Sequence, residues 1–299
     1  MVDFIGIGTG RSGTIWILNA LEEHPQIWFP NPRELNYFSS PRADNSPSEY
    51  EKRGIKGYLD LFKSCPKGKI CGEFSSHYMP DPKVSKIIKK HFPNIKIWAI
   101  LREPVERAFS DYIRGKEFHL KENEDFESAF FAKKNKLYKE GDGYCERGFY
   151  YKHLKPYFDL FPKENIKILL FDDFKEDNEK VIKDLYNFLG VDSSFNPKII
   201  GEKINERTGT KFKGLRAIIS FLADISHQLE KSLIGKFIFA FKRKTKINEV
   251  FNKINELNTK KTVEKDKIDS DLHKKLKKTY SEDIRKLEKL IKKDLGRWR

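Results

Sequence analysis

Short apolar runs alternate along this chain with longer stretches whose apolar residues recur at helical spacing. The apolar runs predict strands near residues 3–8, 69–74, 95–101 and 166–171. The periodic stretches predict helices near residues 14–22, 82–91, 104–117, 149–160 and 176–189. Regular alternation of this kind favours an α/β fold, a three-layer sandwich with a central parallel sheet between layers of helices.

Several weaker patterns complete this prediction. Four strands are a minimum, because extended segments around 27–29 or 197–200 could join the sheet. Gly190 follows an apolar helix end and is expected to be its C-cap. The charged segments 40–57 and 117–147 are expected to be loops with short helices on the rim that faces a substrate.

The C-terminal third is predicted to be mainly helical. A stripe of apolar residues at helical spacing predicts one helix from about Ser270 to Leu295. The most apolar segment, residues 215–241, is interrupted by charges, so a bilayer span is not expected. One or two core helices are the simpler interpretation, and an amphipathic surface resting on a membrane is the alternative. We expect one domain over residues 1–299, with 215–299 belonging to it.

Composition restricts the size of the core, the class of partner and the cellular compartment that we expect. The 299 residues are 38% hydrophobic, enough for a sizeable core, and their formal net charge is +15. Residues 242–299 hold 20 Lys and Arg against 10 Asp and Glu. No regularly placed aromatic residues accompany these charges, so a solvated helix face is expected and a nucleic-acid partner is not. Three cysteines without metal-ligand spacing, and no signal-peptide pattern, predict reduced thiols in a cytoplasmic protein.

A glycine-rich segment joins the first predicted strand to the first predicted helix. Residues 6–14 read GIGTGRSGT, with Arg11 as their one cation. Glycines let a ligand approach the backbone, and free N–H groups at a helix N-terminus favour anions. Gly8 and Gly13 have the spacing of the Walker A pattern, but Thr14 stands where that pattern has its lysine. An anion cradle that differs from the loop of kinases and ATPases is therefore predicted.

A second anion site is predicted after the strand at 95–101. Arg102 follows that strand directly, at the edge where open α/β sheets bind ligands. Pro104 suits the first turn of a helix. Ser110 lies about two helical turns beyond Arg102 and can face the same side. An arginine and a hydroxyl on one face suit a second phosphate.

With these two motifs the chain resembles the sulfotransferases. Residues 8–14 look like the 5′-phosphosulfate loop of that family, and residues 101–110 look like its 3′-phosphate motif. Similar segments follow in the family's order, at residues 33–38, 72–78, 148–154 and 272–298. The resemblance implies a P-loop-like fold and 3′-phosphoadenosine 5′-phosphosulfate (PAPS) as donor. Adenosine 3′,5′-bisphosphate (PAP) would be the product, and no metal is needed.

The resemblance also assigns roles to the residues of both motifs. Arg11 would stabilise the departing phosphate, in the place of a more usual lysine. The 5′-phosphosulfate would be bound by Gly10, Arg11, Ser12, Gly13 and Thr14. The 3′-phosphate would be bound by Arg102 and Ser110. Lys213, in a segment that resembles another loop of the family, is a further candidate for donor binding.

Two residues compete for the role of general base. Glu34 matches the glutamate of the family's lysine-glutamate motif, and a carboxylate in a partly dry site suits proton abstraction. His77 follows a predicted strand and is ranked second. Glu73, Tyr37 and Tyr150 are expected to contact the acceptor. We expect a carbohydrate or lipid-linked hydroxyl as acceptor, less readily an amine, and the chain does not reveal an oligomeric state.

Two other functions remain open at this point. Residues 166–173 could pass for the Walker B strand of a kinase or NTPase, although Thr14 argues against one. A polyanion-binding protein without catalysis would explain the basic tail but would leave both anion motifs unused. A requirement for Mg²⁺ would separate a kinase from a sulfotransferase.

Overall fold

The computed structural model describes residues 2–39, 46–117, 125–132, 143–201, 208–210, 259–261 and 267–299. The chain divides into two compact units, one formed by Met1–Ile204 with Ile268–Arg299 and the other by Asn205–Lys267. In the second unit, β6 (Thr208–Thr210) pairs antiparallel with β7 (Thr259–Lys261). Lys213 and the apolar segment 215–241 lie outside the described residues. A single domain stays a prediction.

The first unit is built on a five-stranded parallel sheet, which confirms the predicted α/β sandwich. Its strands are β1 (Phe4–Gly6), β2 (Ile27–Trp28), β3 (Ile70–Phe74), β4 (Lys96–Leu101) and β5 (Ile166–Leu170). They lie in the order β2-β3-β1-β4-β5, and every neighbouring pair is parallel. The segment at 27–29 supplies the fifth strand, whereas residues 198–200 form a turn. This order puts β1 between β3 and β4, so the glycine-rich loop follows the central strand.

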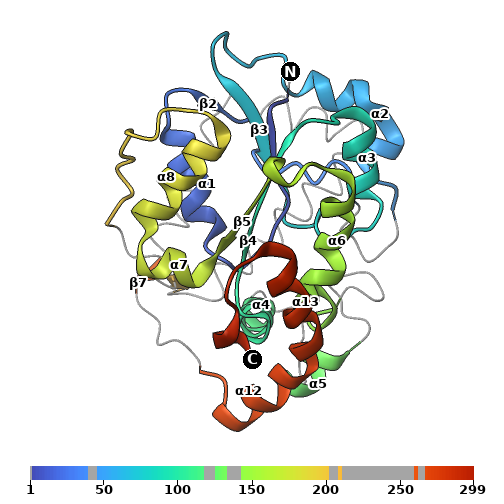
Figure 1. Ribbon diagram of the computed structural model, residues 1–299, viewed down its shortest axis with the longest axis vertical. Helices are drawn as coiled ribbons and strands as arrows, with labels where there is room; N and C mark the ends of the chain where they lie inside the picture. The colour runs from blue at the N-terminus through green and yellow to red at the C-terminus, as the bar shows by residue number, and fades with distance from the viewer. Residues whose placement is uncertain are drawn as a thin grey trace. The chain divides into compact units, whose positions relative to one another are not determined.

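Helices cover both faces of this sheet (Figure 1). One face carries α1 (Thr14–Glu23), α7 (Phe171–Glu176) and α8 (Asn178–Leu189). The other side is packed by α2 (Glu49–Asp60), α3 (Val84–His91), α4 (Pro104–Glu117), α5 (Phe126–Phe131) and α6 (Tyr150–Leu160). Alternate residues of β4 enter the two cores, since Ile97 and Ala99 pack on one side and Trp98 and Ile100 on the other. A sheet buried on both faces explains why these strands read as continuous apolar runs.

Local signals set the ends of several helices. Ser48 and Glu51 form a reciprocal capping box at the start of α2. Asp177 accepts a hydrogen bond from the Lys180 amide at the start of α8. Gly190 ends α8 with a φ of 82°, as predicted from the sequence.

The predicted C-terminal helix is divided in two. It consists of α12 (Ser270–Lys277), a 3₁₀ turn at Lys278–Tyr280 and α13 (Ser281–Ile291). The apolar stripe is still buried, with Leu276, Tyr280, Ile284 and Leu287 at 1% exposure or less. Tyr280 donates a hydrogen bond to the carbonyl of Cys145, at 2.8 Å. The 3₁₀ turn between the two helices changes the chain direction, and α13 then packs against α6.

The cysteines and the membrane prediction can be compared with the structure directly. The structure joins Cys65 and Cys71 in a disulfide and leaves Cys145 free, so the prediction of reduced thiols was wrong for the first two. They meet because the turn after α2 brings Cys65 back beside β3, a proximity that spacing did not reveal. As for membranes, the described helices include none with both the length and the apolar character that a bilayer span requires.

Candidate active site at the carboxyl edge of the sheet

The parallel sheet brings the predicted functional residues to one edge. Arg11 lies in the loop after β1, Ser76 and His77 follow β3, and Arg102 follows β4. Because these strands are neighbours and point the same way, their carboxyl ends lie together. A single site can therefore draw on three loops that are far apart in the sequence.

The glycine-rich loop is held by its own hydroxyl groups. Thr9 Oγ1 lies 2.7 Å from Ser12 Oγ and donates to the carbonyl of Ile100 at 3.0 Å. Gly13, with a φ of 80°, is the N-cap of α1, where no described side chain forms a capping hydrogen bond. The first N–H groups of a helix lack partners within its regular ladder, and in α1 the third of them, from Trp16, donates to the Gly13 carbonyl at 3.1 Å. The loop has the form expected of an anion cradle.

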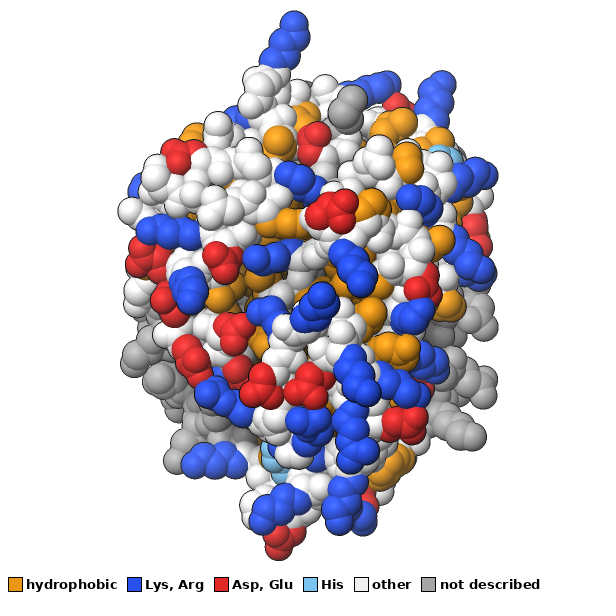
Figure 2. Space-filling model, viewed as in Figure 1, with side chains coloured by type: hydrophobic (Ala, Val, Ile, Leu, Met, Phe, Trp, Pro, Cys, Tyr) orange, Lys and Arg blue, Asp and Glu red, His pale blue; other side chains and the backbone are white. Residues whose placement is uncertain are grey.

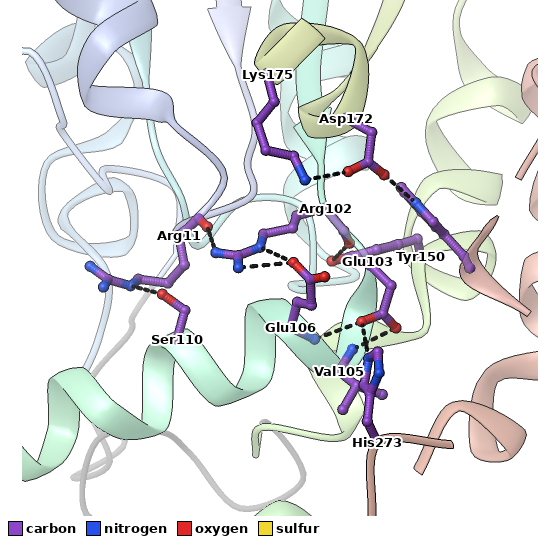
Figure 3. Close-up of polar contacts among 11 residues, drawn as sticks. Arg11, Arg102, Glu103, Val105, Glu106, Ser110, Tyr150, Asp172, Lys175 and His273 are labelled. Carbon is purple, nitrogen blue, oxygen red and sulfur yellow. Dashed lines mark hydrogen bonds and ion pairs between the residues drawn. The ribbon is translucent and has the colours of Figure 1, made fainter. Parts of the chain in front are cut away.

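Arg11, Ser110 and Arg102 form one connected group (Figure 3). Arg11 Nε donates to Ser110 Oγ at 3.2 Å, across 99 positions of sequence. Arg102 Nη1 donates to the Arg11 carbonyl at 3.2 Å. The two predicted anion motifs are thus in direct contact. The structure pairs Ser110 with Arg11, whereas the resemblance had grouped it with Arg102.

Arg102 has a partner that sequence reasoning missed. Its Nε and Nη2 donate to Glu106 Oε2 at 3.2 and 3.0 Å. The guanidinium also lies 5.0 Å from the centre of the Phe171 ring. The hydroxyl of Tyr150 donates to the Arg102 carbonyl at 2.8 Å. The spacing of four residues between Arg102 and Glu106 was the signal in the sequence that could have found this pair.

The C-terminal helices support this side of the site. Glu103 accepts hydrogen bonds from the amides of Val105 at 3.1 Å and Glu106 at 2.8 Å, and so caps α4. His273 Nε2, on α12, lies 2.9 Å from Glu103 Oε2. The start of α4, which carries Glu106, is therefore tied to a helix 170 positions away.

A second C-terminal contact is made through Asp172. Trp298 Nε1 donates to Asp172 Oδ2 at 2.8 Å, and Lys175 pairs with Oδ1 at 2.8 Å. Burial raises the pKa of Asp172, but these two hydrogen bonds together with the charges of Lys175 and Arg102 outweigh it, and the net pKa is lowered. Asp172 thus joins the C-terminal Trp298 to α7, next to Phe171, whose ring lies against Arg102.

The two candidate bases meet at one serine. Glu34 Oε1 accepts hydrogen bonds from Ser76 N at 3.1 Å and Ser76 Oγ at 2.6 Å. The same Ser76 Oγ lies 3.2 Å from His77 Nδ1. Arg147 Nη2 donates to the Ser76 carbonyl at 3.2 Å. Glu34 is exposed, and burial together with the Arg147 charge lowers the pKa of His77 to about 3.

Ser76 also places the candidate bases near the glycine-rich loop. A Cβ atom added to Gly10 would lie 3.6 Å from the Cβ of Ser76. Gly10 and Ser76 are therefore in contact distance, although they follow different strands. Sequence reasoning missed Ser76, whose position next to His77 was the available signal.

The three residues expected to contact an acceptor are buried in the protein. Glu73 and Tyr150 are 0% exposed and Tyr37 is 2% exposed. The Tyr37 hydroxyl donates to the carbonyl of Gly54 at 2.9 Å. Burial raises the pKa of Glu73 to about 7 and that of Tyr150 to about 12. Their polar groups are bonded within the protein, so the structure does not present them to a ligand.

Positive charge continues beyond the site. Figure 2 shows Lys and Arg side chains crowding the surface over α12 and α13. The last turns of these helices contribute Lys274, Lys275, Lys277 and Lys289. Arg33, beside Glu34, is paired instead with Glu22 at 2.6 Å. This surface is a source of attraction for anionic ligands near the site.

Comparison with known proteins places the chain among its relatives. The family model described as "Sulfotransferase domain" matches residues 2–296. The membrane-associated sulfotransferase kil1 of Dictyostelium discoideum is 34% identical over 113 residues, covering 37% of this chain and 22% of that protein. Heparan sulfate glucosamine 3-O-sulfotransferase 3B1 of Mus musculus is 28% identical over 189 residues, covering 62% of this chain and 45% of that protein.

The fold also has a solved counterpart. The crystal structure of a sulfotransferase from Alicyclobacillus acidocaldarius superposes with a TM-score of 0.69 and 22% identity, covering 100% of this chain and 99% of that one. This likeness supports the P-loop-like α/β fold. The chain spans less than half the length of the Dictyostelium and mouse relatives.

Proposed function

The chain belongs to the sulfotransferase family, and from this premise we propose that it transfers a sulfuryl group from PAPS to an acceptor hydroxyl. The observation that carries the proposal is the contact between the two anion motifs. Arg102 donates to the backbone carbonyl of Arg11, so the loop after β1 and the cation after β4 are joined. One nucleotide with phosphates at both ends of its ribose would engage both.

The described residues fit such a donor. The loop from Gly10 to Thr14 would hold the 5′-phosphosulfate through backbone N–H groups and hydroxyls at the start of α1. Arg102 would hold the 3′-phosphate, exchanging its hydrogen bonds to Glu106 for phosphate oxygens. Ser110 lies beside the loop, through its hydrogen bond from Arg11. Lys213 stays a prediction, since it lies outside the described residues.

The proposed reaction is an in-line transfer. The acceptor oxygen forms a new S–O bond, the S–O bond to the donor phosphate breaks, and its electron pair leaves with the phosphate oxygen. Arg11 stabilises the charge that grows on this oxygen, as a fixed fork of donors that stays protonated. Glu34 takes the proton from the acceptor hydroxyl. The loops of the site supply alignment, which is the larger part of such catalysis.

Two observations support Glu34 over His77 as the base. Glu34 is exposed at the rim, and Ser76 bonds only its Oε1 among the described residues. Its Oε2 is therefore available to an acceptor. His77 has a pKa lowered to about 3, which makes its imidazole a poor proton acceptor near neutral pH.

We propose a carbohydrate or lipid-linked acceptor. The relatives described as a heparan sulfate sulfotransferase and as membrane-associated support these two classes. The basic surface over α12 and α13 would favour an anionic glycan or a headgroup. A cytoplasmic location and the absence of a nucleic-acid partner stay predictions.

A labelled-donor screen tests the function. The protein is incubated with radiolabelled PAPS in excess EDTA and three acceptors, namely heparan-type oligosaccharides, glycolipid vesicles and a small aromatic alcohol. We expect labelled product with an added SO₃ by mass, and heat on titration with PAP by calorimetry. If PAP gives neither heat nor thermal protection, the proposal is overturned. ATP turnover that depends on Mg²⁺ would support the kinase alternative instead.

A further inference from the structure

A buried carboxylate lies beneath the loop that carries the proposed base. Glu73, on β3, is 0% exposed, and its carboxylate accepts hydrogen bonds from three hydroxyl groups. Tyr58 and Tyr78 donate to Oε1 at 3.0 and 2.7 Å, and Ser75 donates to Oε2 at 2.7 Å. The backbone N–H of Leu35 is a further donor. Burying an acidic group costs folding free energy unless its hydrogen bonds compensate, so these bonds are expected to serve a role.

These hydroxyl groups continue into the loop that carries Glu34. Ser75 Oγ accepts from the Asn36 amide at 2.8 Å. Tyr78 Oη accepts from the Tyr37 amide at 3.0 Å. The three amides that follow Glu34 are therefore all connected to Glu73. The Leu35 amide is bonded to it directly, and the next two amides are each bonded to a hydroxyl that donates to Glu73. Asn36 has a φ of 47°, a conformation that a non-glycine residue adopts only when its surroundings hold it.

We propose that Glu73, acting through the hydroxyl groups of Ser75 and Tyr78, is a positioning residue that fixes the Glu34 loop against the end of β3. The inference rests on the proposed function, in which Glu34 accepts the proton. Ser76 binds the Glu34 carboxylate, and Ser75, just before it, binds the amide of Asn36. The end of β3 thus holds both the side chain of Glu34 and the backbone beside it. A base held by these hydrogen bonds keeps the position that proton transfer requires.

Two tyrosines offer a matched test. Tyr58 and Tyr78 are both 0% exposed, and each donates to Glu73 Oε1. Only Tyr78 passes the contact on to the Glu34 loop, through the Tyr37 amide. Tyr58→Phe and Tyr78→Phe therefore each remove one hydrogen bond to Glu73 Oε1, but only Tyr78→Phe also releases the loop.

We expect hydrogen exchange to separate the two variants. In the PAP-saturated protein, the peptide over residues 34–39 should exchange about tenfold faster in Tyr78→Phe than in wild type. Tyr58→Phe should stay within about twofold of wild type. With the acceptor found in the screen, kcat should fall about tenfold in Tyr78→Phe alone, while the Kd for PAP is unchanged in both. Equal exchange and equal kcat in the two variants would overturn the inference.

A second variant guards against misfolding. Ser75→Ala removes the other hydroxyl between Glu73 and the loop with little change in volume. It should reproduce the faster exchange over residues 34–39, and wild-type exchange there would count against the inference. Failure of the proposed function appears differently, because wild type would then show no PAP binding and no transfer.

Discussion

Arg102 directs both Nε and Nη2 at a single oxygen of Glu106, four residues further along the chain (Figure 3). The protein thus supplies its own carboxylate at the place proposed for the 3′-phosphate. Arg102 is 21% exposed and Glu106 38% exposed in their side chains, so solvent screens the pair in part. Glu106 is then a competitor of the donor nucleotide for the same guanidinium.

Removing this competitor should strengthen nucleotide binding. We expect Glu106→Gln to lower the Kd for PAP about fivefold at low ionic strength, because a negative charge beside the phosphate is lost. Calorimetry at two salt concentrations would measure it, and the gain should shrink at high salt. Glu127→Gln is the control, since Glu127 pairs with Lys275 away from Arg102. Weaker binding by Glu106→Gln would mean that Glu106 orients Arg102 for the phosphate.

The base assignment is tested by separating turnover from binding. Glu34→Gln keeps the shape of the side chain but cannot take a proton at this step, so kcat should fall by about 10²–10⁴-fold. The Kd for PAP should stay within about twofold, since Glu34 makes no contact with either arginine motif. His77→Asn should keep kcat within about threefold. Full activity in Glu34→Gln with a dead His77→Asn would reverse the assignment.

Arg11 should be needed for more than its charge. Arg11→Lys keeps a cation but loses the fork and the hydrogen bond to Ser110, so we expect kcat to fall about tenfold. Arg11→Ala should cost about 10²–10³-fold, as for other donors to a developing negative charge. Steady-state kinetics with Ser110→Ala as comparison would show how much of the lysine effect comes from the lost bond. Equal rates for Arg11→Lys and wild type would contradict the role of the fork.

Glu73 predicts a pH-dependent difference in stability. Burial raises its pKa to about 7 in the folded protein, against 4.5 for the free group. Between these values the folded state binds more protons than the unfolded state, so the contribution of Glu73 is largest at low pH and declines toward pH 7. Relative to Glu73→Gln, wild type should lose on the order of 3 kcal/mol between pH 4.5 and pH 8.

Urea unfolding of both proteins across this range measures the difference. His77 and His153 have lowered pKa values and oppose the trend at acid pH, but they are common to both proteins and cancel. Parallel stability curves would show that Glu73 stays ionised when buried.

Much of the fold was readable because its signals are local. The runs before Gly8 and Arg102 mark strands, and the glycine-rich loop needs only its own residues to become an anion cradle. The positions of Arg11 and Arg102 at strand ends follow from the parallel sheet alone. The same reasoning found the cap at Gly190 and the buried stripe of the C-terminal helices, although not their division at Lys278–Tyr280.

The sequence by itself therefore determined the family, the α/β sheet and the loops in which the active site is proposed. Tertiary structure decided the partners. It joined Arg11 to Ser110 and Glu34 to Ser76. It also buried Glu73, which was expected to contact the acceptor, beneath the loop that carries Glu34. A sheet covered on both faces buries every position of a central strand, so alternation could not tell a polar residue in the core from one at the site. Contacts between residues so far apart in the chain depend on how the helices pack, and no local pattern records that packing.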